Sequence, residues 1–131
     1  MTRQNITLDD IRPDIMPTGS IYTPTLVNGA NVDSSTAYSL MWYRIKNFVT
    51  VVGQIAVDAT ATGAVATVNA SLPVPHNLVA STDLQGLIND GTNGGGRIIG
   101  NVASGTADIT FWPSAATNRL LSLIFVYKVQ P

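Results

Sequence analysis

From residue 21 onward the sequence consists of short runs in which apolar and polar residues alternate, separated by clusters of Gly, Asn, Asp, Thr and Pro. Alternation with a period of two is typical of β-strands with one buried face, whereas a helix needs a period near 3.6. Residues 64–72 show the pattern most regularly, with Ala66, Val68 and Ala70 on one face. No run has the period of a three-turn helix, so the pattern predicts an all-β chain.

Eight runs of this kind can be distinguished. The predicted strands are residues 21–27, 36–46, 48–58, 64–72, 83–89, 97–103, 106–112 and 119–129. Turn signals recur about every 8–12 residues, which is typical of β-sandwiches and barrels. Eight antiparallel strands favour a sandwich of the jelly-roll type. We therefore expect an eight-stranded, antiparallel, jelly-roll-like sandwich formed by residues 21–131.

The first 20 residues differ from the rest, because their apolar residues stand singly between Pro13, Pro17 and Gly19. Such a segment cannot form a core of its own. We expect residues 1–20 to be an extended N-terminal attachment arm, and the alternative is a frayed terminus. The candidate docking residues of this arm are Ile6, Leu8, Ile11, Ile15 and Met16.

The composition excludes several kinds of site. The chain has no cysteine, which rules out disulfides, thiolate zinc sites and cysteine nucleophiles. Its seven basic residues are scattered and its net charge is −1, so neither nucleic acid nor a membrane is an expected partner.

The low charge also bears on association. Charged residues make up 11% of the chain, against about 25% in an average soluble domain. A low charge beside 45% apolar residues predicts an oligomer, and the alternative is a monomer coated by Ser, Thr and Asn.

The N-terminus lacks the apolar segment of a signal peptide, and no stretch approaches the roughly 18 apolar residues of a membrane span. We therefore expect a soluble protein made in the cytoplasm.

Candidate catalytic groups are few. His76 is the only histidine, and without cysteine it needs several Asp residues to form a zinc site. A Ser-His-Asp arrangement stays open by residue count, but no serine lies in a G-x-S-x-G motif. Asp108 lies in a predicted strand, where pairing with Arg97 or Arg119 is expected rather than glycosidase chemistry. No catalytic residue, metal ligand or cofactor is predicted, and the chain is not expected to be an enzyme.

The glycine-rich stretch at residues 93–97 invites comparison with a phosphate-binding loop. Such a loop needs a following G-K-[ST] motif and a helix, whereas a predicted strand follows here. Calcium ligation by Asn89, Asp90 and Asn93 does not have the spacing of a known calcium loop. We expect a flexible connection between two strands.

Two pairs of adjacent aromatic residues lie in predicted strands, at residues 42–43 and 111–112. Neighbouring strand residues point to opposite faces, so each pair sends one ring outward or toward another subunit. Aromatic residues are enriched at protein interfaces. Trp42, Tyr43 and Trp112 are therefore the predicted interface aromatics.

Several short motifs occur in a recognisable order. They are Y-T-P-T-L at 22–26, S-T-A-Y at 35–38, Y-R-I-K-N-F-V-T-V-V-G at 43–53, S-L-P at 71–73 and T-N-R-L-L-S-L-I-F-V-Y at 117–127. This order resembles a small β domain common in the structural proteins of tailed-phage virions, with motifs such as Y-x-R-x-G-N-x-V-T-V-S-G. The resemblance covers about residues 20–129. The sequence departs from the pattern at Lys46, where a glycine often stands, and at residues 111–113.

The resemblance implies a non-enzymatic, jelly-roll-like virion protein that forms trimers. With only a short arm before the domain, it suggests a capsid decoration protein or the base of a head fibre. The expected partners are further copies of the chain and the major capsid protein or another virion protein, and the expected location is the virion. The alternative is a receptor-binding tip that recognises host surface glycans. A third hypothesis, an enzyme acting on surface polysaccharide, requires a cleft with paired carboxylates.

Overall fold

The structure is a computed structural model, and it describes residues 18–92 and 94–130. These residues form ten β-strands and one short 3-10 helix, with no α-helix among them, which confirms the all-β prediction. The elements are β1 (Thr18–Tyr22), β2 (Leu26–Asn28), β3 (Val32–Ala37), β4 (Leu40–Ile45), β5 (Phe48–Ala59), β6 (Ala66–Ala70), η3 (Ser81–Asp83), β7 (Leu84–Asn89), β8 (Gly95–Asn101), β9 (Thr106–Phe111) and β10 (Asn118–Lys128).

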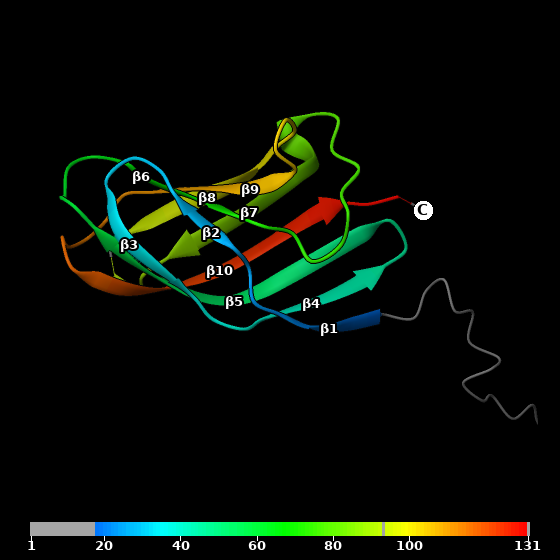
Figure 1. The fold of residues 1–131 in the computed structure, drawn as a ribbon, viewed down its shortest axis with the longest axis horizontal. Coiled ribbons are helices and arrows are strands. Elements are labelled where there is room, and N and C mark those ends of the chain that lie inside the picture. The colour runs from blue at the N-terminus through cyan, green and yellow to red at the C-terminus, as the bar shows by residue number, and fades with distance from the viewer. Residues whose placement is uncertain (1–17, 93, 131) are drawn as a thin grey trace, which may run out of the picture.

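All strand pairs are antiparallel and belong to one curled sheet with the order β1-β4-β5-β10-β7-β8-β9-β6-β2. Strand β5 organises this order. It pairs along its whole length with β10, while its other edge pairs first with β4 and then with β3. In Figure 1 the curl places β1, β4 and β5 on one side of the molecule and β6, β8 and β9 on the other.

The turn between β2 and β3 ties distant parts of this sheet together. Gly29 N–H donates to the Thr67 carbonyl at 2.8 Å, and Thr67 N–H donates to the Ala30 carbonyl at 3.0 Å. On the other side of the turn, Thr60 N–H donates to the Asn31 carbonyl at 3.1 Å. Since Thr67 lies in β6 and Thr60 directly follows β5, the turn bridges the two sides of the curled sheet.

The structure has ten strands rather than the predicted eight, because two predicted strands are each divided. The run 21–27 is interrupted at residues 23–25, where Pro24 cannot donate a ladder hydrogen bond. The run 36–46 is interrupted after β3, since β3 and β4 pair with different halves of β5. The other six predicted strands each correspond to one observed strand.

The predicted boundary between arm and domain falls inside β1. Thr18 faces Arg44 in the register of β1 with β4, so residues 18–20 belong to the sheet. The candidate docking residues of the arm lie outside the described residues: Ile6, Leu8, Ile11, Ile15 and Met16.

The inner face of the sheet forms one apolar core. Its largest fully buried side chains are Tyr127, Phe125, Leu40, Ile55, Leu84, Ile88, Ile98, Ile109 and Leu121. Gly53 lies at an inward position in the middle of β5 with φ 153°, and a Cβ atom there would lie 2.6 Å from Leu40 Cδ2. The absence of a side chain at Gly53 therefore makes room for Leu40 in the core.

Candidate interaction surface

The opposite, outward side of five neighbouring strands is also apolar. One cross-strand row runs over β1, β4, β5, β10 and β7 and consists of Ile21, Met41, Val52, Ile124 and Leu87, each facing the next. Ile21 and Leu87, at the two ends of the row, are 65% and 66% exposed. The row is therefore a continuous apolar stripe across half of the sheet.

Further apolar side chains flank this stripe. Tyr43, Ile45, Phe48, Leu120 and Val126 are all exposed and occupy outward positions of β4, β5 and β10. We call these five residues and the five of the stripe the outer apolar face. Nine of the fourteen exposed large apolar side chains of the described residues belong to it.

The same side of the sheet changes character beyond β7. In the row of Leu87, the next partners are Arg97, Thr110 and Thr67 on β8, β9 and β6. The neighbouring row there includes Asp108 and Asn69. Only one half of the outward surface is thus apolar, while the other half has the polar residues expected of a solvated sheet.

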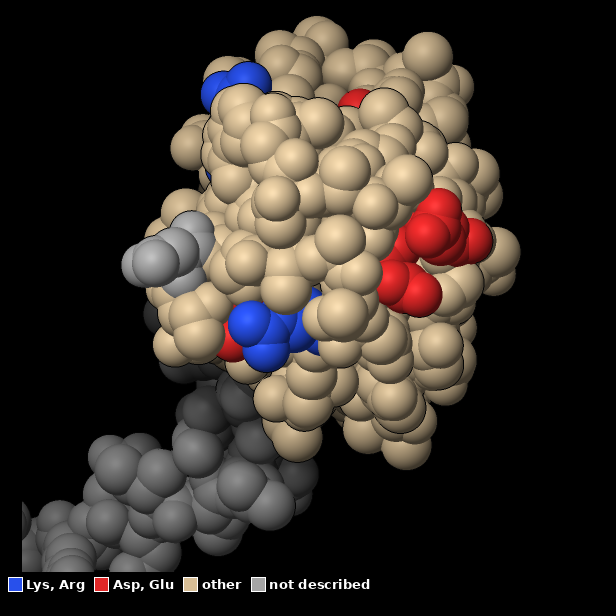
Figure 2. Space-filling model, turned by 90° about the vertical axis from the view of Figure 1, so that its left-hand side faces the viewer, with Lys and Arg blue, Asp and Glu red and all other residues tan. Residues whose placement is uncertain are grey.

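Charges are sparse on the apolar half. The charged residues at outward positions of its five strands are Asp58, near the end of β5, and Lys128, at the end of β10. Figure 2 shows the same sparseness on another side of the molecule, where charged atoms form a few separate spots on an uncharged surface. The described surface therefore offers no continuous charged patch on these two sides.

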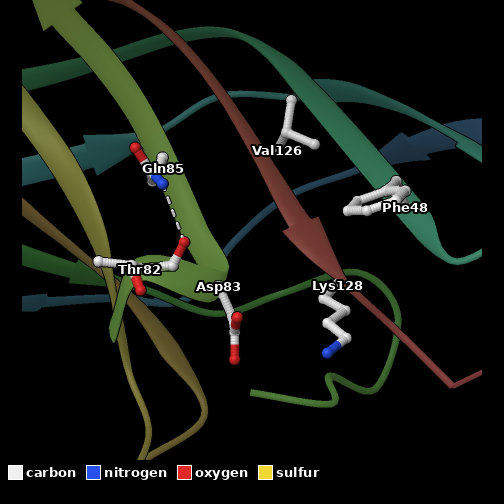
Figure 3. A pocket seen from close by; sticks show the side chains of 6 residues that line it. All are labelled: Phe48, Thr82, Asp83, Gln85, Val126 and Lys128. Atoms are coloured by element: carbon white, nitrogen blue, oxygen red, sulfur yellow. Dashed lines mark hydrogen bonds between the residues drawn. The ribbon is translucent and has the colours of Figure 1, made fainter. Parts of the chain in front are cut away.

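One hollow of about 390 Å³ lies at the margin of the outer apolar face. Phe48, Val126 and Lys128 line it from β5 and β10, and Thr82, Asp83 and Gln85 line it from η3 and β7 (Figure 3).

The polar groups of this hollow are held in place locally. The Asp83 carboxylate accepts hydrogen bonds from Ala80 N–H at 3.0 Å and Val79 N–H at 2.9 Å. These bonds, followed by the nearby Lys128 charge, lower the pKa of Asp83. Gln85 Nε2 donates to the Thr82 carbonyl at 3.0 Å. The hollow therefore combines an exposed ring with fixed polar groups.

A second hollow of about 440 Å³ lies on β1 and β4, at the edge of the sheet. Its lining residues are Gly19, Ser20, Ile21, Met41, Trp42 and Tyr43. Two members of the stripe, Ile21 and Met41, take part in it, so the outer apolar face extends to the edge strand.

The three predicted interface aromatics lie in different surroundings. Tyr43 is 39% exposed and belongs to the outer apolar face. Trp112 is 55% exposed and directly follows β9. Trp42 is half-buried and packs against the core. The structure therefore brings one of the three onto the apolar face and turns Trp42 inward.

The predicted pairing of Asp108 with an arginine is wrong. Asp108 accepts hydrogen bonds from Asn101 Nδ2 at 3.3 and 3.5 Å, while Arg119 lies beside Asp90. His76 is half-buried, and its Nδ1 accepts a hydrogen bond from Leu78 N–H at 3.0 Å. Among the described residues, no group of three or more His and Asp side chains is placed to hold a metal ion.

The glycine-rich connection between β7 and β8 is organised by Asp90, whose side chain is 1% exposed. One carboxylate oxygen accepts from Thr92 N–H at 3.0 Å, Thr92 Oγ1 at 2.6 Å and Gly94 N–H at 3.1 Å. The other accepts from Ser114 Oγ and lies 3.9 Å from Arg119 Nε. Burial opposes ionisation, but the hydrogen bonds from Ser114, Thr92 and Gly94 outweigh it and hold the pKa of Asp90 at about 2. The connection is thus anchored around a buried carboxylate.

The stripe could not be predicted from the sequence. Ile21, Met41, Ile124 and Leu87 come from strands far apart in the sequence, and only the register aligns them. The available signal was local: residues 41–45 and 120–126 are rich in apolar residues at both odd and even positions.

Comparisons with protein-family models, with curated proteins and with solved structures found no match to this chain. Among the described residues, none forms a helix with the length and apolar character needed to cross a membrane. The described residues form an antiparallel β protein in which one half of the outward side of the sheet is apolar.

Proposed function

We propose that this chain is a structural protein of a tailed-phage virion, either a capsid decoration protein or the base of a head fibre. It has no catalytic role, forms trimers and attaches through the N-terminal residues before β1 to the major capsid protein or another virion protein. The observation that carries this proposal is the outer apolar face, because assembly proteins bury such surfaces against neighbours.

Contacts between the motifs that resemble virion proteins support the proposal. Tyr22 and Thr25 belong to the Y-T-P-T-L motif, and Ser71 begins the S-L-P motif. Tyr22 OH donates to the Ser71 carbonyl at 3.2 Å, and Thr25 N–H donates to Ser71 Oγ at 2.8 Å. Two motifs that lie 46 residues apart in the sequence are therefore joined by hydrogen bonds in the fold, which is expected if both belong to one domain pattern.

The hairpin between β4 and β5 gives a second line of support. Arg44, which matches the arginine of the Y-x-R-x-G-N motif, donates from Nε to the Lys46 carbonyl at 2.8 Å. Lys46 has φ 53°, the left-handed conformation that glycine adopts most easily. The position where the resembling proteins often have glycine is thus a position where the backbone favours glycine.

The proposed function also implies a more specific fold than a curled antiparallel sheet. We interpret the curled sheet as a jelly-roll-like sandwich, with β1, β4, β5 and β10 contributing one layer and β6, β8 and β9 the other. The turn between β2 and β3, hydrogen-bonded to both sides, is the corner between the layers.

The proposal can be tested on phage particles. Gold-labelled antibodies against the chain should decorate the heads of the virions that contain it, at regularly spaced positions. Virions lacking the gene product serve as the control. Unlabelled heads would contradict the decoration role, and label at the tail tip would favour the next candidate.

A second candidate function is a receptor-binding tip that recognises host surface glycans. The hollow of Figure 3 favours it, because an exposed Phe48 ring lies near the polar side chains of Asp83 and Gln85. Sugar rings stack on aromatic side chains while their hydroxyl groups bond to carboxylates and amides. Binding of the purified chain to host cells, lost in the variant Phe48→Ala, would support this function. Equal binding by Phe48→Ala and the unaltered chain would remove the hollow as the receptor site.

A further inference from the structure

We infer that the outer apolar face is the surface through which copies of this chain contact one another. The inference rests on the self-association in the proposed function and adds which side of the molecule is buried. Three properties of the face support it: its size, its lack of charge and its contrast with the other half of the sheet.

The size of the face suits a permanent protein contact. From the exposed fractions of its nine exposed large side chains, it presents on the order of 900 Å² of accessible surface. The largest apolar patch of a typical monomer is roughly 300–600 Å². A stable interface removes about 800 Å² from each partner. The outer apolar face is therefore comparable in area to the surface that one stable interface removes from each partner.

The chemistry of the face favours a second copy as its occupant. Aliphatic and aromatic side chains carry no net charge that a partner has to match. Around a threefold axis, different parts of the outer apolar face can therefore pack against one another in neighbouring copies. The charged outward residues, Asp58 and Lys128, lie at the ends of β5 and β10, away from the central stripe. A charged partner such as nucleic acid or an anionic lipid surface finds no matching charge there.

The stripe indicates where the contact is centred. Val52 and Ile124 face each other on β5 and β10, with two further strands on one side and one on the other. An interface core is depleted of charge and fully desolvated, while its rim is polar. On the side of the stripe away from Phe48, the exposed residues Gln54, Ser122 and Asn89 face one another and belong to such a rim.

A charge placed on the stripe tests the inference. Leu87→Asp and Ile124→Asp each add a carboxylate to the proposed contact, and Val27→Asp is the matched control. Val27 is 61% exposed on β2, at the far end of the sheet order, against 66% for Leu87. Circular dichroism and urea unfolding midpoints establish that each variant folds. The association of the full chain is then measured by analytical ultracentrifugation over a range of concentrations.

We expect the unaltered chain and Val27→Asp to form the same oligomer, while both stripe variants dissociate at least ~100-fold more readily because an unpaired carboxylate would be buried. An oligomer that all three variants retain would overturn the inference and leave the proposed function standing. An unaltered chain that is monomeric at every concentration would overturn the inference together with the trimer, and antibody labelling of virions would still decide the virion role independently.

The lack of cysteine allows a second measurement that does not rely on disrupting the contact. A single thiol at Ile124→Cys should react with a thiol reagent at least ~10-fold more slowly in the oligomer than after dilution to monomers. A thiol at Val27→Cys should react at the same rate in both states. Equal rates for Ile124→Cys in oligomer and monomer would contradict burial of the stripe.

Discussion

Replacement of the buried carboxylate at Asp90 should change both the stability of the domain and its dependence on pH. Its oxygens accept hydrogen bonds from Thr92, Gly94 and Ser114, which hold the pKa of the folded state at about 2 against a usual value of 3.8. A folded-state pKa below that of the unfolded chain contributes stability that is complete above the unfolded value and is lost as the pH falls through the folded value. Each unit of difference corresponds to about 1.4 kcal/mol, so the difference between 3.8 and about 2 gives Asp90 a contribution of at most about 2.5 kcal/mol.

The variant Asp90→Asn keeps the shape of the side chain and removes the ionisation. At pH 6 its free energy of unfolding should be lower by about 1–2 kcal/mol, and the difference should vanish as the pH approaches 2. Urea unfolding at a series of pH values between 6 and 2, at one protein concentration, measures this directly. Asp33→Asn is the control, because Asp33 is exposed and accepts a side-chain hydrogen bond from Thr60 Oγ1 at 2.6 Å.

Two results would refute the reasoning about Asp90. One is a variant as stable as the unaltered chain at pH 6. The other is a loss of stability with acid that has the same slope in Asp90→Asn as in the unaltered chain, since the carboxylate at 90 could then not be its source.

Three further substitutions follow from the same structure. Lys46→Gly should stabilise the domain by about 0.5–1 kcal/mol, because the φ of 53° at Lys46 is adopted more easily by glycine. An unchanged or lower urea concentration at the unfolding midpoint would contradict this. Gly53→Ala should lower the free energy of unfolding by about 1–3 kcal/mol, because the alanine Cβ would lie 2.6 Å from Leu40 Cδ2. An unchanged free energy of unfolding would show that the core relaxes freely there. Tyr127→Phe should lower the free energy of unfolding by about 1–3 kcal/mol. The Tyr127 hydroxyl donates a hydrogen bond to the Val74 carbonyl at 2.8 Å and accepts one from the Val74 N–H at 3.0 Å. A calorimetric melting temperature equal to that of the unaltered chain would argue against this loss.

The fold class could be predicted from the sequence because alternation is a local property. The run 119–129 placed Leu121, Leu123 and Phe125 on one face, and these side chains are indeed buried in the core. The division of the run 36–46 could not be predicted in the same way, because β3 and β4 separate only through their pairing with different halves of β5. Strand order in a sheet is set by such long-range contacts, which no local pattern records.

The candidate surface shows the same limit. Tyr43 was predicted at an interface from its neighbour in the strand, and it is exposed on the outer apolar face. The stripe itself depends on Met41, Val52 and Ile124 lying side by side. The hairpin of β4 and β5 aligns Met41 with Val52, but Ile124 joins them only through the long-range pairing of β5 with β10. The anchoring of Asp90 by Ser114, 24 residues away, was hidden for the same reason, so the glycine-rich connection was predicted to be flexible.

The most direct test of self-association is the mass of the unaltered full chain in solution. Native mass spectrometry at micromolar concentration should give a principal species of three times the chain mass of 13.8 kDa. A principal species of 13.8 kDa under the same conditions would contradict self-association of this chain.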